Sequence, residues 1–204
     1  MAIPSSTALA NAEAVFRRHG GTLRSAEAIA AGIQPRTLYW MHEEGFLERL
    51  SWGVYHLAAH PLPEQPDVAA VVRRVPHAVV CLVSALDYHK VGTQIPAEVQ
   101  IALPRGTKTP RIEFPRVRVF SMSAVSLHAG VEVAGAGGFT FNVFGIAKTV
   151  ADCFKYRNRI GLDIAVEALR EAIRERRTTP AEIMEFARID RVDKVIRPYL
   201  EALA

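Results

Sequence analysis

The stretch QPRTLYWMHEEGFLERLSWGVYHL, residues 34–57, places a helix pattern directly before two strand patterns. Pro35 suits the first helical position, because its missing N–H would have no partner there, and Gly45 ends the helix about three turns later. The patterns FLERL and VYHL are joined by Ser51-Trp52-Gly53, where Gly53 is able to adopt the positive φ of a tight turn. The stretch therefore predicts a helix followed by a hairpin.

Two further helices are expected before this stretch. Apolar residues recur at helical spacing in the first: Leu9, Ala12, Val15 and Phe16. Ser25 is a good N-cap for the second, in which Ile29 is the expected core residue, and Gly32 closes it. Two short helices separated by a glycine-containing turn form a helix-turn-helix, and the hairpin that follows makes it a winged helix.

The third helix has one face that its own core does not need. At about 100° per residue, Leu38 and Met41 point inward, where they are expected to pack on Ile29, Phe16 and Leu47. The opposite face carries three large polar or aromatic side chains: Arg36, Trp40 and Glu43. In a helix-turn-helix this outward face enters the major groove of DNA, where an arginine pairs with guanine N7 and O6.

The expected DNA contacts lie on this helix and on the hairpin: Gln34, Arg36, Thr37, Tyr39, Trp40, Arg49, Ser51 and Trp52. The two aromatic residues of the helix have other possible uses, since aromatic side chains are buried more often than they contact bases. Trp40 would then pack against the second domain, and Tyr39 would be partly in the core.

The chain has 204 residues and a formal net charge of +4, and the excess is unevenly spread. Residues 1–60 contain five arginines and five glutamates, so the expected winged helix-turn-helix domain has no net formal charge. The excess positive charge lies in a basic stripe, residues 105–118, with a single acidic residue among them. The basic residues of the stripe are Arg105, Lys108, Arg111, Arg116 and Arg118. Such a stripe suits nucleic-acid phosphates or an acidic partner protein.

The remainder of the chain predicts an α+β fold. The proline-rich segment 61–66 is the expected linker between a winged helix-turn-helix domain (1–60) and a mixed α/β domain (67–204). The latter would contain a small sheet, with strands at 98–104, 116–120 and 139–144 and a glycine-rich turn at 135–138, and a helical C-terminus from Gly145. In the first C-terminal helix, Lys148, Asp152 and Lys155 are expected on the outer side, where residues three and four apart pair.

No catalytic, metal or cofactor site emerges from the sequence, so we expect no enzyme. Asp87, Glu98 and Gln100 bear a faint likeness to the acidic residues of Mg²⁺-dependent nucleases, but the third position is not lysine. Ser84 and His89 are five residues apart on one predicted helix and do not stack, so His89 is expected to be a packing or hydrogen-bonding residue. The two cysteines are expected to be buried, reduced thiols.

Three segments of the chain resemble the AbiEi family of antitoxins from bacterial type IV toxin–antitoxin systems. These are SWGVYHL (51–57), VSALDYHKVG (83–92) and KTVADCFKYRNRIGLDIAVEALREAI (148–173), of which the last is the most specific. The resemblance implies a winged helix that binds inverted repeats in its own promoter, and a C-terminal domain that counters a nucleotidyltransferase-type toxin. Family members often have a basic residue just before the glycine of the wing, where this chain has Trp52, so the contact to phosphate is expected from Arg49.

The predicted function is that of a cytoplasmic transcriptional repressor and antitoxin. Its partners would be double-stranded promoter DNA, bound by a monomer or by a dimer formed on DNA, and a toxin; no membrane is expected, because there is neither a signal peptide nor an apolar run of sufficient length. Two other hypotheses stay open. One is a nucleic-acid-processing, nuclease-like enzyme with a winged-helix targeting domain. The other is a winged helix that binds only proteins through Trp40 and Tyr39.

Overall fold

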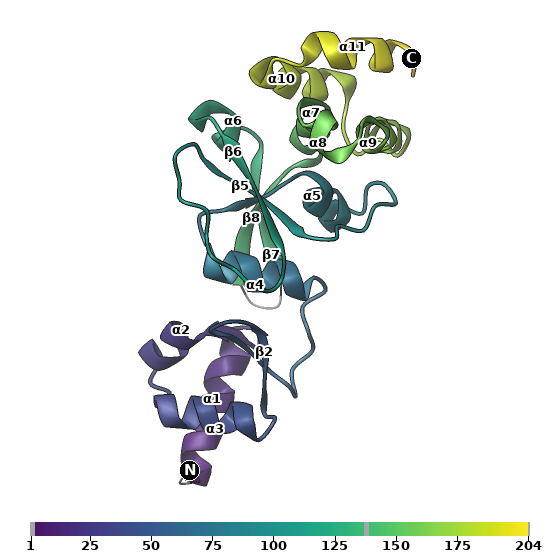
Figure 1. Cartoon of the computed structure of the whole chain (residues 1–204). Coiled ribbons are helices and arrows are strands. Elements are labelled where there is room, and N and C mark those ends of the chain that lie inside the picture. Colours follow the sequence, from purple (N-terminus) through teal and green to yellow (C-terminus); the bar gives the residue numbers. More distant parts are fainter. Residues whose placement is uncertain (1–2, 137–138, 204) are drawn as a thin grey trace. The chain divides into compact units, whose positions relative to one another are not determined.

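The computed structural model describes residues 3–136 and 139–203, which form two compact units. The first unit contains residues 1–76, 110–116 and 134–141, and the second contains residues 77–109, 117–133 and 142–204. The chain is thus of the mixed α+β class with two sheets, as predicted (Figure 1).

Three helices, a three-stranded sheet and a fourth helix build the first unit. Its elements are α1 (Ser6–Arg18), β1 (Thr22–Arg24), α2 (Ser25–Ala30), α3 (Pro35–Glu43), β2 (Leu47–Ser51), β3 (Val54–Leu57) and α4 (Pro66–Arg74). The sheet has the order β1-β3-β2, with both pairs antiparallel. The predicted helix–hairpin sequence of residues 34–57 is therefore confirmed, with Pro35 at the start of α3 and Gly53 at a φ of 72° in the hairpin turn.

The core of this unit is made by the inward sides of α1 and α3 and by the sheet. Phe16, Leu38, Met41 and Leu47 are all buried, as predicted. The prediction for α2 was wrong, because Ile29 is 44% exposed and the neighbouring Ala28 is buried instead. Each residue advances an α-helix by about 100°, so Ala28 and Ile29 point in different directions. The short α2 therefore contributes only the methyl group of Ala28 to the core.

Helix α4 belongs to the first unit, which therefore extends beyond the predicted linker at 61–66. It packs against β1, β2 and β3. Arg73 donates to the Glu27 carboxylate and to the carbonyl of His19, each at 3.2 Å. These bonds from the C-terminal end of α4 explain why the boundary falls after Pro76 rather than in the proline-rich segment.

The other elements include a five-stranded sheet and seven helices among the described residues. They are β4 (Val79–Val80), α5 (Leu82–His89), β5 (Val99–Pro104), β6 (Val117–Met122), α6 (Ala124–His128), β7 (Val131–Ala136), β8 (Phe139–Phe144), α7 (Ile146–Lys155), α8 (Arg157–Ile160), α9 (Leu162–Arg174), α10 (Pro180–Asp190) and α11 (Asp193–Glu201). The sheet order is β6-β5-β4-β8-β7; β4 is antiparallel to β5 and parallel to β8, so the sheet is mixed, as predicted.

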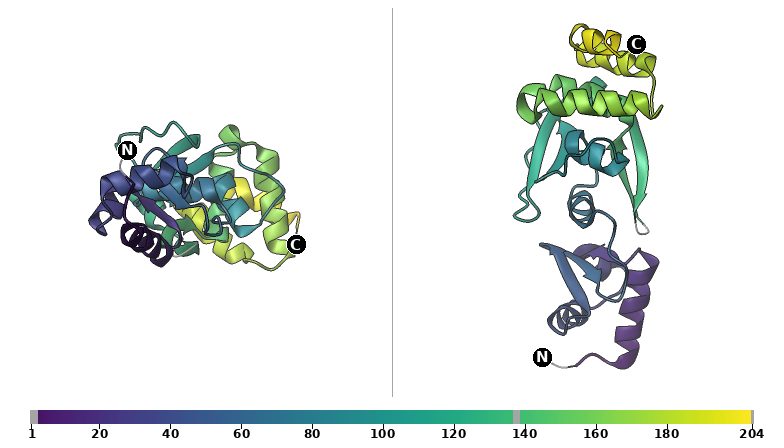
Figure 2. Two further views of the ribbon diagram at one scale, coloured as in Figure 1. Left: turned by 90° about the horizontal axis from the view of Figure 1, so that it is seen from below. Right: turned by 90° about the vertical axis from the view of Figure 1, so that its right-hand side faces the viewer.

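The C-terminal helices gather on one side of this sheet, around α7 (Figures 1 and 2). Helix α7 contacts α5, α9, α10 and α11, which leaves little of its surface to solvent. Both cysteines are free and buried, as predicted, and burial raises the pKa of each thiol. Helix α6 and strand β7 were not predicted, and the predicted glycine-rich turn lies partly outside the described residues, at 137–138.

Within the described part of the chain, no helix has the length and apolar character that crossing a membrane requires.

Candidate nucleic-acid interface

Helix α3 presents a continuous outward stripe of four residues. Arg36, Tyr39 and Glu43 are exposed, and Trp40 is half-buried. Their spacings of three, four and seven place them along one side of the helix. Among the described residues, no hydrogen bond or ion pair engages Arg36 or Glu43, so both charged groups are available to a partner.

The opposite side of α3 is used by the fold. Leu38 and Met41 are buried, and the His42 ring hydrogen-bonds to the carbonyl of Leu47 at 3.1 Å. Thr37 is also buried, with 3% of its surface exposed, although it was expected at the interface. Gln34 is exposed at the N-cap and makes no side-chain cap bond, so its amide is free to reach outward.

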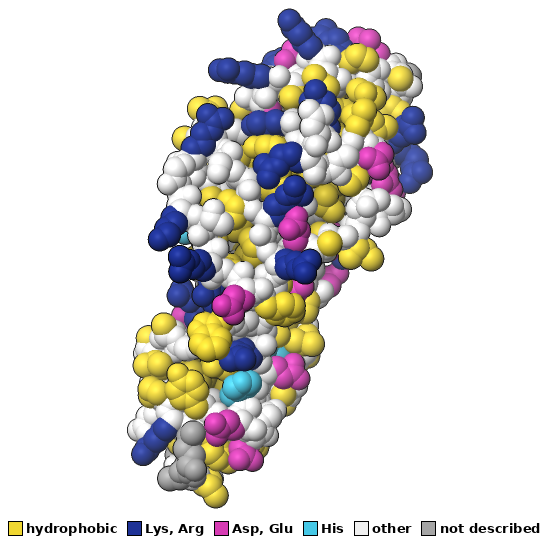
Figure 3. All heavy atoms as spheres, viewed as in Figure 1, with side chains coloured by type: hydrophobic (Ala, Val, Ile, Leu, Met, Phe, Trp, Pro, Cys, Tyr) yellow, Lys and Arg dark blue, Asp and Glu magenta, His cyan; other side chains and the backbone are white. Residues whose placement is uncertain are grey.

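The two aromatic side chains of α3 differ in their surroundings. Trp40 stacks on Phe46, with ring centroids 5.6 Å apart, and so is held within its own unit. Tyr39 is 52% exposed and is not a core residue. Phe46 is also 43% exposed. Hydrophobic side chains are visible on the surface of the first unit (Figure 3).

The β2–β3 hairpin exposes a second pair of candidate residues. Trp52 is 69% exposed, and the Arg49 guanidinium carbon lies 5.2 Å from the centroid of its ring. Arg74 of α4 donates to the carbonyl of Trp52, which fixes the turn from inside the same unit. Ser51 was also expected at the interface, but it is buried and donates its hydroxyl to the carbonyl of Phe114.

The basic residues of the predicted stripe are divided between the two units. Arg111 and Arg116 belong to the first unit, and Arg105, Lys108 and Arg118 belong to the second. All are exposed except Arg118, which is half-buried. Its guanidinium lies 3.4 Å from the Glu98 carboxylate, so part of its charge is already balanced.

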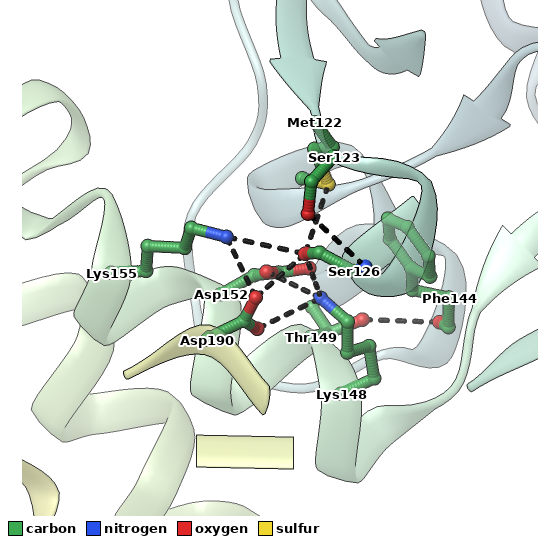
Figure 4. A network of polar contacts seen from close by, with 9 residues as sticks. All are labelled: Met122, Ser123, Ser126, Phe144, Lys148, Thr149, Asp152, Lys155 and Asp190. Carbon is green, nitrogen blue, oxygen red and sulfur yellow. Dashed lines mark hydrogen bonds and ion pairs between the residues drawn. The ribbon is translucent and has the colours of Figure 1, made fainter. Parts of the chain in front are cut away.

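A cluster of buried charges in the second unit was missed from the sequence. Lys148 Nζ lies 2.6 Å from Asp152 Oδ1 and 2.9 Å from Asp190 Oδ2, and all three side chains are fully buried (Figure 4). Lys155 Nζ and the Ser126 hydroxyl each donate to Asp190 Oδ1 at 2.6 Å. We call these five residues the α7 charge cluster. The expectation that Lys148, Asp152 and Lys155 lie on an outer helix face was wrong.

The two carboxyl groups of the α7 charge cluster are shifted in opposite directions. Burial raises the pKa of Asp152 to about 8, since the charge of Lys148 only partly offsets burial and the nearby Asp190 adds to it. Burial also acts to raise the pKa of Asp190, but Lys148 and the hydrogen bonds from Lys155 and Ser126 outweigh it and hold this pKa below its ordinary value. The cluster thus joins α7 to α10 and α6.

The residues weighed for catalysis are occupied by structural contacts. Glu98 pairs with Arg118, and the Gln100 side chain accepts from the Val83 N–H at 3.0 Å. Ser84 accepts from the Gln100 N–H, whereas His89 bonds to the carbonyl of Phe144 at 2.8 Å, as expected for a hydrogen-bonding histidine. Within residues 3–136 and 139–203, no three His, Cys, Asp or Glu side chains are arranged to hold a metal ion.

Comparison with known proteins finds a family match within the N-terminal region. Residues 12–58 match the family model described as "Transcriptional regulator, AbiEi antitoxin", a span that runs from α1 to the end of the β2–β3 hairpin. No curated protein matches the chain. The crystal structure of the RV2827C protein from Mycobacterium tuberculosis is similar in fold, with a TM-score of 0.60 and 12% identity over 91% of this chain and 72% of that one. The resemblance to the AbiEi family of antitoxin transcriptional regulators is thereby confirmed over residues 12–58.

Proposed function

We propose that the first unit is a winged helix-turn-helix that binds promoter DNA, and that the protein represses its own operon. The single observation that carries this proposal is the outward stripe of α3, where Arg36 is exposed and has no partner among the described residues. An unpaired arginine on the second helix of such a motif is suited to guanine in the major groove. The family match over residues 12–58, which describes transcriptional regulators, supports the same proposal.

Five further residues belong to the proposed interface. Gln34, at the N-cap of α3, and Tyr39 lie near Arg36 and would contact phosphates or base edges. Trp40, which stacks on Phe46, would make an apolar contact with the DNA. Arg49 and Trp52 of the hairpin would contact the adjacent backbone, with the arginine already positioned over the indole ring. Thr37 and Ser51 are left out, because both side chains are buried.

The test is fluorescence anisotropy with duplex DNA from just upstream of the gene, measured against a scrambled duplex at two salt concentrations. Selective binding by the wild type, weakened by roughly 1–3 kcal/mol in Arg36→Ala, is the expected result. Arg170→Ala is a matched control, because Arg170 is an exposed helical arginine of the second unit. Equal, weak binding to both duplexes would contradict the proposal and would favour a winged helix that binds only proteins.

The basic residues are proposed to add affinity without sequence preference. Arg105, Lys108, Arg111 and Arg116 are exposed, and each phosphate they neutralise steepens the dependence of affinity on salt. Charge reversal at Arg111 and Arg116 tests this role. The salt slope is expected to become shallower, and an unchanged slope would remove both residues from the DNA interface.

The antitoxin activity is proposed for the remainder of the chain, on the resemblance of residues 148–173 to the family. The partner would be a nucleotidyltransferase-type toxin, and the protein would work in the cytoplasm. Co-expression of a toxin encoded beside the gene tests this proposal. Growth is expected to be rescued by the full chain and also by its Arg36→Ala variant, since the proposed DNA contact is not needed for neutralisation; failure of the full chain to rescue growth would contradict it.

A further inference from the structure

The chemistry of the α3 stripe changes in order along the helix. Its first member, Arg36, carries only donors, and its last member, Glu43, carries only acceptors when ionised. The aromatic residues Tyr39 and Trp40 lie between them. The charged ends are both exposed and neither is engaged by another described residue, so each has its full bonding capacity for a ligand.

The distance between the two ends matches a small number of base pairs. Seven residues of α-helix rise about 10.5 Å. Successive base pairs of B-form DNA are about 3.4 Å apart. A helix lying along the major groove would therefore set the two charged side chains about three base pairs apart.

The two ends select different base edges. Guanine offers two acceptors, N7 and O6, to an arginine, whereas cytosine offers its N4 amino group to a glutamate. Guanine or thymine at the position of cytosine would place an acceptor against the carboxylate and leave a desolvated charge without a donor.

We propose, resting on the proposed function, that α3 reads a half-site in which Arg36 recognises a guanine and Glu43 recognises a cytosine about three base pairs away. Glu43 then has two effects at once. It repels phosphates and so lowers affinity for every sequence. It also accepts a hydrogen bond from cytosine and so raises selectivity for that base. This fits a first unit whose N-terminal 60 residues carry balanced charges.

The proposal is tested by an exchange of specificity. In vitro selection from a random duplex library with the wild-type chain first defines the half-site, which is expected to contain the guanine and the cytosine at this spacing. Glu43→Gln is then measured by anisotropy against four duplexes that differ only at the cytosine. Because glutamine pairs with adenine N6 and N7, the preference is expected to move from cytosine to adenine by about tenfold.

Glu44→Gln is the matched control. Glu44 is adjacent, exposed and equally charged, but it lies one residue past α3 and off the stripe, so its variant is expected to keep the cytosine preference. Circular dichroism of both variants tests whether they fold as the wild type does.

The outcomes separate this proposal from the one on which it rests. A wild-type half-site that lacks the cytosine, or equal changes on all four duplexes in Glu43→Gln, would overturn the proposed recognition and leave selective DNA binding in place. A selection that enriches no sequence would overturn the proposed function as well.

Discussion

Helices α3 and α7 both carry charged residues at spacings of three, four or seven, yet the fold uses them in opposite ways. The outer side of α3 is uncovered, so Arg36 and Glu43 are exposed. Helix α7 is surrounded by other helices, so Lys148 and Asp152 have no exposed surface and pair with each other. The comparison teaches that the same spacing of charges serves a ligand or the core, depending on what else packs against the helix.

The largest effect is expected from breaking the α7 charge cluster. Lys148→Met would leave Asp152 and Asp190 buried without their shared cation, at a cost of about 3–5 kcal/mol in the free energy of unfolding. Urea unfolding followed by circular dichroism measures this loss, and hydrogen exchange of the α7 amides localises it. Lys194→Met, an exposed lysine on α11, is the control and is expected to stay within about 0.5 kcal/mol of the wild type. Equal stabilities for the two variants would contradict a structural role for the cluster.

A second comparison uses two glycines with positive φ. At Gly130 a Cβ atom would lie 2.7 Å from Lys148 Cβ, whereas at Gly45, just after α3, it would meet nothing within 4 Å. Gly45→Ala is expected to cost about 1–2 kcal/mol from its left-handed backbone alone. Gly130→Ala is expected to cost a further amount of about 1–3 kcal/mol because it overpacks the side of α7. Thermal or urea unfolding of the two variants tests this. Equal losses of stability would show that the side chains around Gly130 move aside at little cost.

A smaller effect is expected with pH. The pKa of Asp152 is raised to about 8 in the folded chain, above its ordinary value near 3.8, so the folded state binds this proton more tightly. The stabilisation from this proton is complete at pH values below the pKa of Asp152 in the unfolded chain, and it is lost as the pH rises through about 8. Wild type should therefore lose stability relative to Asp152→Asn as the pH rises from about 4 to about 8. Parallel urea midpoints for the two proteins over this range would contradict the raised pKa.

Local sequence patterns predicted the three helices and the hairpin at the start of the first unit. Pro35, Gly45 and Gly53 mark the ends of α3 and the hairpin turn, and the helical period separates Leu38 and Met41 from Arg36 and Glu43. These features depend on neighbours within a few residues. The same reasoning wrongly expected Ile29 in the core, where Ala28 is buried instead, and it expected a DNA contact from Thr37 on the flank of α3, whose side chain is buried. A local pattern does not show which neighbouring elements pack on the edge of a helix face.

The α7 charge cluster could not be predicted in this way. Asp190 is 42 residues from Lys148, and Ser126 comes from an unpredicted short helix. A Lys–Asp pair four residues apart has the same sequence pattern on a solvated helix as on a buried one. Val150, Cys153 and Phe154 are all fully buried, but their spacing places them on one face of α7, so the apolar pattern did not indicate that the opposite face is buried too.

The central claim is that the outward charge of α3 serves DNA and not the fold, and Arg36→Ala tests it most directly when affinity and stability are measured on the same sample. Selectivity for the upstream duplex over the scrambled one is expected to fall by roughly 1–3 kcal/mol. The free energy of unfolding is expected to stay within about 0.5 kcal/mol of the wild type. Unchanged selectivity, or a loss of selectivity matched by an equal loss of stability, would contradict the claim.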